Sequence, residues 1–245
     1  RYPYPCRRAR LGRRQALTTR DCESLTTRQI NLLVRELVAG GETDICLRNP
    51  GARHNLLVGL FSDVRVTLEG SAGYFCAGMV DGPTVETHGN VGWSVAENMM
   101  SGHITVRGNA GSSTGATIRG GTLIVHGNAG ARTGIAMKGG TIVVRGNTGY
   151  MTGFMMQRGT MIICGDAGEA LGDSMYTGRI FVGGKIAELG NDAVIEPLTE
   201  DDQAFLAATL EQAEIAHGYD FKKVVSGRRL WNFSTKDRGL WIQAL

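Results

Sequence analysis

Two histidines and a cysteine that recur at one position of a repeated phrase are the side chains best suited to chemistry. His88 and His126 lie two repeats apart with Arg107 midway between them, and Cys164 follows after another two repeats. Two imidazoles can share a zinc ion if their nitrogens both lie about 2 Å from it. A thiol becomes a nucleophile when a base lies within hydrogen-bond distance. Both possibilities depend on how the repeats position these residues.

Carboxylates and glycines offer further candidates. Glu188, Asp192 and Glu196 form either a hydrogen-bonding patch or a solvated linker. The phrase GGTLIVHGNAG has G-x-G spacing, but a dinucleotide-binding loop requires a helix after the glycines, and the sequence predicts none there. Calcium-binding β-rolls require GGxGxD nonapeptides, which are missing as well.

Composition limits the class of protein. The chain has 245 residues, 36 glycines, 7% aromatic residues and a net charge of +3. Glycine does not recur at every third residue, so collagen is excluded, and no apolar run approaches the length of a membrane-spanning helix. The cysteines are odd in number and lack CxxC spacing, which disfavours zinc, an iron–sulfur cluster and a disulfide framework in this chain. We therefore expect reduced thiols and a cytoplasmic protein. The cysteines are Cys6, Cys22, Cys46, Cys76 and Cys164.

The elements that must position these side chains are four copies of one phrase, which begin at Gly102 and repeat every 19 residues. They read GHITVRGNAGSSTGATIRG, GTLIVHGNAGARTGIAMKG, GTIVVRGNTGYMTGFMMQR and GTMIICGDAGEALGDSMYT. A period near 20 with short β-branched runs is typical of a solenoid. The sequence predicts a mainly β protein, a right-handed parallel β-helix of about seven coils, about 34 Å long at the spacing of a sheet.

Residues that share a repeat position form columns along this solenoid. Glycine columns indicate corners with positive φ or with no room for a Cβ atom. The Gly-Asn pairs suggest that asparagine also takes a left-handed corner, or that stacked side-chain amides bond to one another. An apolar column predicts interior filling. Its members are Met99, Ile118, Met137, Met156 and Met175.

The predicted stacking argues against the first two chemical candidates. His88 and His126 would be two coils apart, with backbones separated by about 9.6 Å. Cys164 would have no base beside it and is better explained as a small buried hydrophobe. We therefore predict no catalytic, cofactor-binding or metal-binding residue in this chain.

The chain before the regular coils divides into two parts. Residues 1–20, which begin RYPYPCRRARLGRR, are predicted to be a basic, disordered extension, although such a tail can also bind nucleic acid. Residues 21–60 are predicted to contain a helix that covers the open first coil, followed by an irregular coil. Thr26 opens this helix and Gly40 ends it, with an apolar stripe between them.

The β-helix itself is predicted for residues 61–197, and residues 198–245 for a helix and a tail. Thr199 and Asp202 resemble a capping box at the start of this second capping helix. The tail carries Trp231, Phe233 and Trp241 among basic residues, which favours a protein contact over stacking on single-stranded nucleic acid.

The repeats resemble a known family. GNAGxxTGxxMKGGTIVVRGN is similar to the GXGXG domain, the C-terminal β-helix of the glutamate synthase large subunit, and to the β-helix subunit of formylmethanofuran dehydrogenase. The flanking phrases NPGARHNLLVGL, VGWSVAENMMSG, VGGKIAELG and KKVVSGRRLWNF resemble the free-standing β-helix subunit of N-methylglutamate synthase. This resemblance covers about residues 20–245.

The resemblance implies a non-catalytic scaffold subunit of a hetero-oligomeric enzyme of the transferase or oxidoreductase type. An amidotransferase-like subunit and a synthase subunit with FMN and an iron–sulfur cluster would be its partners. Methylamine and L-glutamate would give N-methyl-L-glutamate and ammonia. No cofactor, nucleic acid or membrane is expected for this chain itself.

Other readings of the repeats remain open. One is the equivalent subunit of a glutamate synthase that uses glutamine and 2-oxoglutarate, and a weaker one is the corresponding subunit of formylmethanofuran dehydrogenase. A carbohydrate-binding β-helix would need exposed aromatic rows or paired carboxylates. In the regular coils only Trp93 and Tyr150 share a column.

Overall fold

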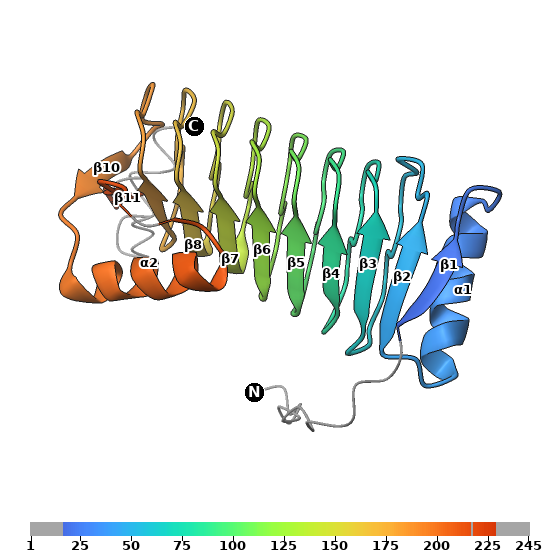
Figure 1. Ribbon diagram of the computed structural model, residues 1–245. Coiled ribbons are helices and arrows are strands. Elements are labelled where there is room, and N and C mark those ends of the chain that lie inside the picture. Colours follow the sequence, from blue (N-terminus) through green and yellow to red (C-terminus); the bar gives the residue numbers. More distant parts are fainter. Residues whose placement is uncertain (1–16, 217, 229–245) are drawn as a thin grey trace, which may run out of the picture.

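The computed structural model describes residues 17–216 and 218–228. These residues form one sheet of eleven strands and two helices, arranged as an elongated stack (Figure 1). The strands are β1 Thr18–Asp21, β2 Asp44–Arg48, β3 Arg65–Glu69, β4 Thr84–Thr87, β5 His103–Val106, β6 Thr122–Val125, β7 Lys138–Val144, β8 Arg158–Ile163, β9 Arg179–Val182, β10 Ala193–Glu196 and β11 Lys222–Ser226. The helices are α1 Thr27–Ala39 and α2 Glu200–Gln212.

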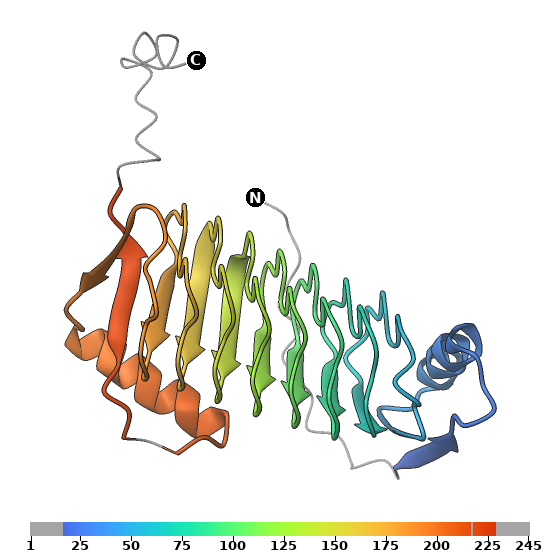
Figure 2. The same cartoon turned by 90° about the horizontal axis from the view of Figure 1, so that it is seen from above.

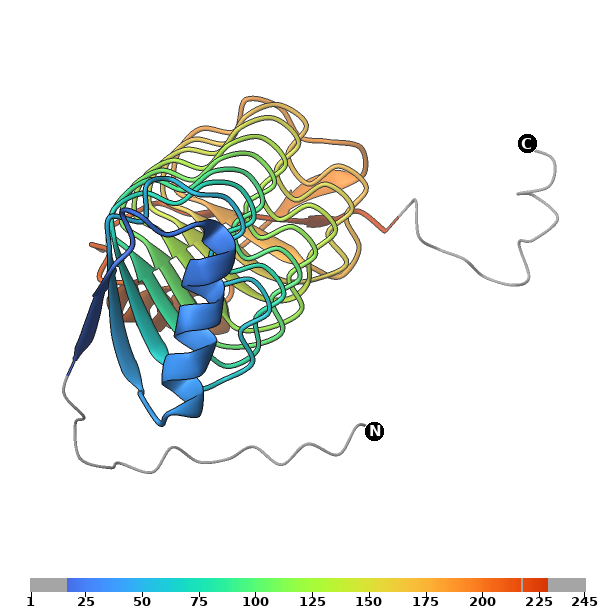
Figure 3. The same ribbon diagram turned by 90° about the vertical axis from the view of Figure 1, so that its right-hand side faces the viewer.

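The predicted parallel β-helix is confirmed. Strands β2 to β9 contribute one strand to each coil and pair in parallel in chain order, over about seven turns. Ile104 pairs with Leu123 and Leu123 with Ile142, which is the predicted 19-residue step. Viewed along the axis, the coils superpose in a right-handed staircase with the strands on one side (Figure 3).

The first coil is longer than the others. Arg48 of β2 pairs with Glu69 of β3, a step of 21 residues, whereas Arg65 of β3 pairs with Thr84 of β4 at the regular period. The irregular early coil predicted before residue 61 is therefore confirmed. The regular period begins at β3.

The interior is mainly apolar, although Thr87 of β4 is 1% exposed at the position that pairs with Val106. Alternate strand residues such as Ile104 and Val106 point inward and are fully or almost fully buried. The second predicted column fills the space opposite them, and its members are at most 1% exposed. They are Met99, Ile118, Met137, Met156 and Met175.

The corners use glycine for both of the predicted reasons. Gly115 and Gly134 have φ of 65° and 67°, a left-handed conformation in which a Cβ atom is unfavourable. Gly130 does not have positive φ, but an added Cβ would lie 2.7 Å from the backbone nitrogen of Ser112 in the preceding coil. One corner therefore has the left-handed conformation that glycine favours, although Ala77 and Ala96 also adopt it at the equivalent positions, with φ of 51° and 58°. The other corner requires the small size of glycine.

The asparagine column differs from both expectations. Asn109 and Asn128 do not take left-handed φ, so that prediction is wrong. The side-chain Oδ1 of each asparagine instead accepts the backbone N–H of the matching residue in the next coil, as in the 2.8 Å bond from Asn128 N to Asn109 Oδ1. The ladder is side chain to backbone rather than amide to amide. It is built by Asn90, Asn109, Asn128 and Asn147.

Helix α1 closes the N-terminal end of the stack, as predicted (Figures 1 and 3). Thr26 is the N-cap and forms a capping box with Gln29, and Ile30 and Val34 are buried against the first coils. Strand β1 pairs in parallel with β2. The predicted extension over 1–20 is therefore wrong at residues 18–20, which the sheet orders, and residues 1–16 lie outside the described residues.

The C-terminal end differs from the prediction in where α2 lies. Thr199 and Asp202 form the predicted capping box, but α2 runs along the outer face of the sheet instead of across its end (Figures 1 and 2). It packs on outward-facing apolar residues of β6 to β9, whose equivalents in β3 to β5 are polar or charged. These apolar residues are Ile124, Val143, Ile162 and Phe181.

Antiparallel strands close the C-terminal end instead. Strand β11 pairs with β9 on one side and β10 on the other. The predicted aromatic residues Trp231, Phe233 and Trp241 of the tail lie outside the described residues.

Neither helix of the described part is long and apolar enough to cross a membrane.

The glycine corners predict a matched pair of stability effects. Gly130→Ala should lower the free energy of unfolding by about 1–3 kcal/mol, because the new methyl group meets only backbone atoms, which cannot rotate away. Gly78→Ala is the control, since its Cβ would lie 3.5 Å from the nearest atom, an oxygen of Phe75. Urea unfolding of both variants tests the difference. Equal stability of the two variants would contradict the close-packing explanation.

Candidate functional site

The structure places the predicted histidine column inside a charged cluster on the outer face of the sheet. Arg107 donates from Nε to Glu86 Oε1 at 2.6 Å and from Nη1 to Glu214 Oε2 at 2.8 Å. Its Nη1 also lies 3.2 Å from His126 Nε2. His88 reaches the same Glu86 carboxylate at 3.6 Å. Arg107 therefore separates the two imidazoles, and each of them contacts a charged group.

This cluster lines a hollow of about 180 Å³ at the C-terminal end of α2. Burial lowers the pKa of His126, and the neighbouring Arg107 guanidinium lowers it further. Burial and Arg65 likewise lower the pKa of His103 in the same hollow. Because Arg107 can only donate, the neutral His126 accepts at Nε2 and carries its proton on Nδ1. The cluster thus ties Glu214, just beyond α2, to the sheet.

A shared metal site is not formed by these residues. Within residues 17–216 and 218–228, no three histidine, cysteine or acidic side chains come close enough together to hold an ion. The cluster contains a guanidinium at its centre, which repels a cation.

Cys164 has the environment of a structural cysteine. Its side chain is buried with the apolar residues that pack under α2. Burial raises its thiol pKa to about 12, although Tyr219 and Arg145 act in the opposite direction. A thiol with this pKa is not a thiolate near neutral pH, so the prediction of a small buried hydrophobe is confirmed. Cys22, Cys46 and Cys76 are also buried and free, and Cys6 lies outside the described residues.

The acidic run does not assemble into one site. Asp192 accepts a 3.0 Å hydrogen bond from Ser226 in β11. Glu196 lies 4.0 Å from Lys223, also in β11, while Glu188 is exposed in the last coil. Two of the three carboxylates therefore help to hold the closing strands.

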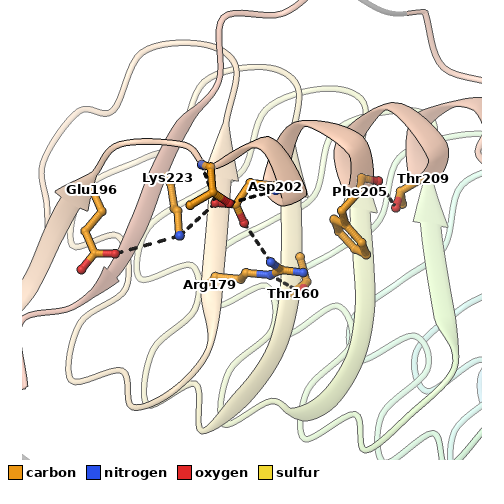
Figure 4. Close-up of polar contacts among 8 residues, drawn as sticks. Thr160, Arg179, Glu196, Asp202, Phe205, Thr209 and Lys223 are labelled. Atoms are coloured by element: carbon orange, nitrogen blue, oxygen red, sulfur yellow. Dashed lines mark hydrogen bonds and ion pairs between the residues drawn. The ribbon is translucent and has the colours of Figure 1, made fainter.

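A buried carboxylate that the sequence indicated only as a helix cap is the centre of a second polar network (Figure 4). Asp202 is 2% exposed. It accepts from Arg179 of β9 and from Lys223 of β11, each at 2.9 Å, and from the backbone of Thr199 at 3.1 Å. The Arg179 guanidinium also lies over the ring of Phe205, 4.6 Å from its centroid. One side chain thus joins α2 to two strands.

Sequence reasoning missed a row of stacked rings. His54 stacks on Tyr74 with centroids 4.4 Å apart, and Tyr74 stacks on Trp93 at 5.3 Å. Trp93 is 57% exposed. The signal was that Tyr74 and Trp93 are one repeat apart, in the stretch before the four regular copies. His54 precedes Tyr74 by 20 residues instead of 19, because the first coil is longer, so the repeat spacing did not indicate that the two rings stack.

These rings belong to what we call the aromatic face. We define it by exposed large side chains in the turns that follow the strands. The members are His54, Tyr74, Phe75, Met79, Trp93, Tyr150 and Met155. Large apolar groups exposed together mark an interaction surface. The sheet side of the later coils, in contrast, is already covered by α2.

Comparison with known proteins agrees with this architecture. A family model described as GXGXG motif matches residues 52–212, which include seven of the eight coil strands, β3 to β9. A search of curated proteins gives no match.

The Asp202 network predicts a pH-dependent stability. Burial alone would raise the pKa of Asp202, but the hydrogen bonds from Lys223 and Thr199 outweigh it and lower the pKa from 3.8 to about 2. This depression corresponds to about 2 kcal/mol of stability, which is present above the unfolded-state pKa of 3.8 and lost as the pH falls toward 2. Asp202→Asn should therefore be less stable than the wild type by about that amount at pH 7, with a difference that shrinks below pH 3.8.

Asp201→Asn is the matched control for this measurement, because Asp201 is exposed on the same turn of α2. Thermal or urea unfolding as a function of pH compares the three proteins. A pH-independent difference between the wild type and Asp202→Asn would contradict the assignment.

Proposed function

The chain belongs to the GXGXG motif family, and from this membership we propose that it is the scaffold subunit of a multi-subunit synthase related to glutamate synthase. The flanking phrases NPGARHNLLVGL and KKVVSGRRLWNF favour an N-methylglutamate-synthase-like complex within that group. Such a complex would convert methylamine and L-glutamate to N-methyl-L-glutamate and ammonia.

The aromatic face is the observation that carries the proposal. Tyr74 and Trp93 are exposed in the isolated chain, and their burial against a partner would be favourable because aromatic rings carry a large apolar area. Tyrosine and tryptophan are also enriched among the residues that dominate protein interfaces. The rings are held by a backbone bonded to the coil before and the coil after, as in the bonds of Gly92 N to Ala72 O and of Val91 N to Asn109 O. The face is therefore rigid before any partner binds.

The proposed mechanism is positional. We propose that an amidotransferase-like subunit and a synthase subunit dock on this β-helix, and that FMN and an iron–sulfur cluster belong to the synthase subunit. A rigid frame fixes the distance between two reaction centres, and small misplacements of reacting groups reduce the rate strongly. Pre-organised contact residues also lower the entropic cost of docking.

The aromatic row also bears on the carbohydrate-binding alternative, because it supplies part of what that function requires. The three rings, however, stack on one another, with interplanar angles of 26° and 17°. Most of their faces are therefore covered by a neighbouring ring, while sugars stack on open ring faces. The arrangement favours edge contacts with a protein, and a glycan-binding screen of the chain distinguishes the two.

Loss of the aromatic row is predicted to release the partner subunits. Each ring should contribute on the order of 2 kcal/mol to docking, so Tyr74→Asp combined with Trp93→Asp should weaken binding at least about 100-fold. Pull-down of the complex from its native host, followed by titration of the isolated subunits, measures this.

Phe61→Asp is the control, since Phe61 is 70% exposed but lies outside the aromatic face. Circular dichroism establishes that all variants remain folded. If the double variant still bound both partner subunits, the proposed docking role of this face would be contradicted.

Reconstitution tests the reaction. The chain alone should give no turnover of methylamine and L-glutamate, and the three-subunit complex should form N-methyl-L-glutamate. Turnover by the isolated chain would contradict the scaffold role. Activity of the complex only with glutamine and 2-oxoglutarate would support the glutamate synthase alternative instead.

A further inference from the structure

The sheet ends in an exposed apolar edge at its C-terminal end. Strand β10 is the last in the strand order and, among the described residues, pairs only with β11. Val194 and Ile195 in its centre are 39% and 52% exposed. Successive strand residues point to opposite faces, so apolar surface is exposed on both sides of this edge. Its unpaired backbone groups offer a template for another strand.

The opposite edge is protected in a way that this one is not. Strand β1 has the sequence TTRD, and its last two residues, Arg20 and Asp21, are charged and exposed. Charged side chains on an edge strand discourage pairing with another chain. Helix α1 covers the end of the stack beside it (Figure 1). Pairing of β10 with β1 of another molecule, which would build a fibre, is therefore disfavoured.

We propose that β10 pairs with β10 of a second copy of this chain, antiparallel and about a two-fold axis. With the axis at Ile195, Ile195 of each copy lies opposite Ile195 of the other, because a two-fold axis normal to the sheet keeps each side chain on its own face. Val194 then lies opposite Glu196, so no like charges face each other. Because the described part of each copy has one such edge and the pairing uses it, the assembly closes at two copies.

The charges at the two ends of the edge support the antiparallel direction. Glu196 ends β10, and Glu200 and Asp201 follow at the start of α2. At the other end, Ser226 pairs with Ala193, and the exposed Arg228 lies two residues beyond it. Antiparallel pairing brings the acidic end of one copy toward Arg228 of the other. Parallel pairing would bring the two acidic ends together, which is unfavourable.

The dimer adds to the proposed function without depending on it. Strand β10 lies at the end of the stack, away from α1 (Figure 2). The aromatic face occupies the turns of the coils and stays open in both copies, so a complex built on the dimer would contain two of each docked subunit. The edge is only four residues long, so we expect a concentration-dependent equilibrium typical of small interfaces.

Sedimentation equilibrium of the purified full chain over a range of concentrations tests the proposal. The wild type should approach twice the chain mass of 26.2 kDa as concentration rises. Val194→Lys combined with Ile195→Lys should remain at the monomer mass at concentrations where the wild type is mostly dimeric. Leu32→Lys is the matched control on α1, where Leu32 is 45% exposed, and it should dimerise as the wild type does.

Charge reversal tests the direction of pairing even if the lysine variant folds poorly. Glu196→Lys should weaken the dimer at least several-fold, and Arg228→Glu in the same chain should restore most of the loss. A wild type that stays monomeric, or a lysine variant that is folded and still dimerises, would overturn the proposal. A Glu196→Lys defect that Arg228→Glu deepens would overturn the antiparallel arrangement.

Discussion

In-register stacking of coils of equal length is the constraint on which the rest of this structure depends. From β3 to β9 the strands keep the 19-residue repeat, so nearly every backbone group meets its equivalent in the next coil at the spacing of a sheet. Local shifts occur at Lys138, which pairs with Arg158, and in the last coil, where Leu171 pairs with Leu189. Gly127, for example, donates to Gly108 below it and accepts from Gly146 above it. An insertion within a coil would break this match for both neighbours. The one longer coil accordingly lies at the end of the stack, beneath α1.

The same stacking turns single side chains into columns, and each column has one physical role. Inward columns form the core, glycine columns allow corners that pack backbone against backbone, and the asparagine column bonds each coil to the next. Outward columns are free to vary. Ile124, Val143, Ile162 and Phe181 are apolar because α2 covers them, while Glu86 and Thr105 at the same position line the polar hollow at the C-terminal end of α2.

Polar chemistry in this molecule mainly serves to hold elements together. Asp202 joins α2 to β9 and β11, and Arg107 joins the residue after α2 to the middle of the sheet. In both clusters each charged group forms an ion pair, which offsets the free-energy cost of removing it from water. Among the described residues, apolar side chains are exposed at the aromatic face and at β10, and also at separate positions such as Leu32 and Phe61. A frame with fixed polar joints and open apolar surfaces suits a subunit that works by contact with other chains.

The sequence by itself determined the coil, its period, its interior column and both helix starts, because these follow from local repetition and from neighbours along the chain. It also separated His88 from His126, since repeat spacing converts directly to distance. It did not determine where α2 lies, because a capping box fixes how a helix begins and not which surface it meets. Only the tertiary structure decided that, and it decided the stacking of His54 on Tyr74, because the longer first coil had shifted the spacing. The asparagine ladder was also decided by the tertiary structure. The distance between stacked coils determines whether an asparagine side chain bonds to the next side-chain amide or to the next backbone N–H.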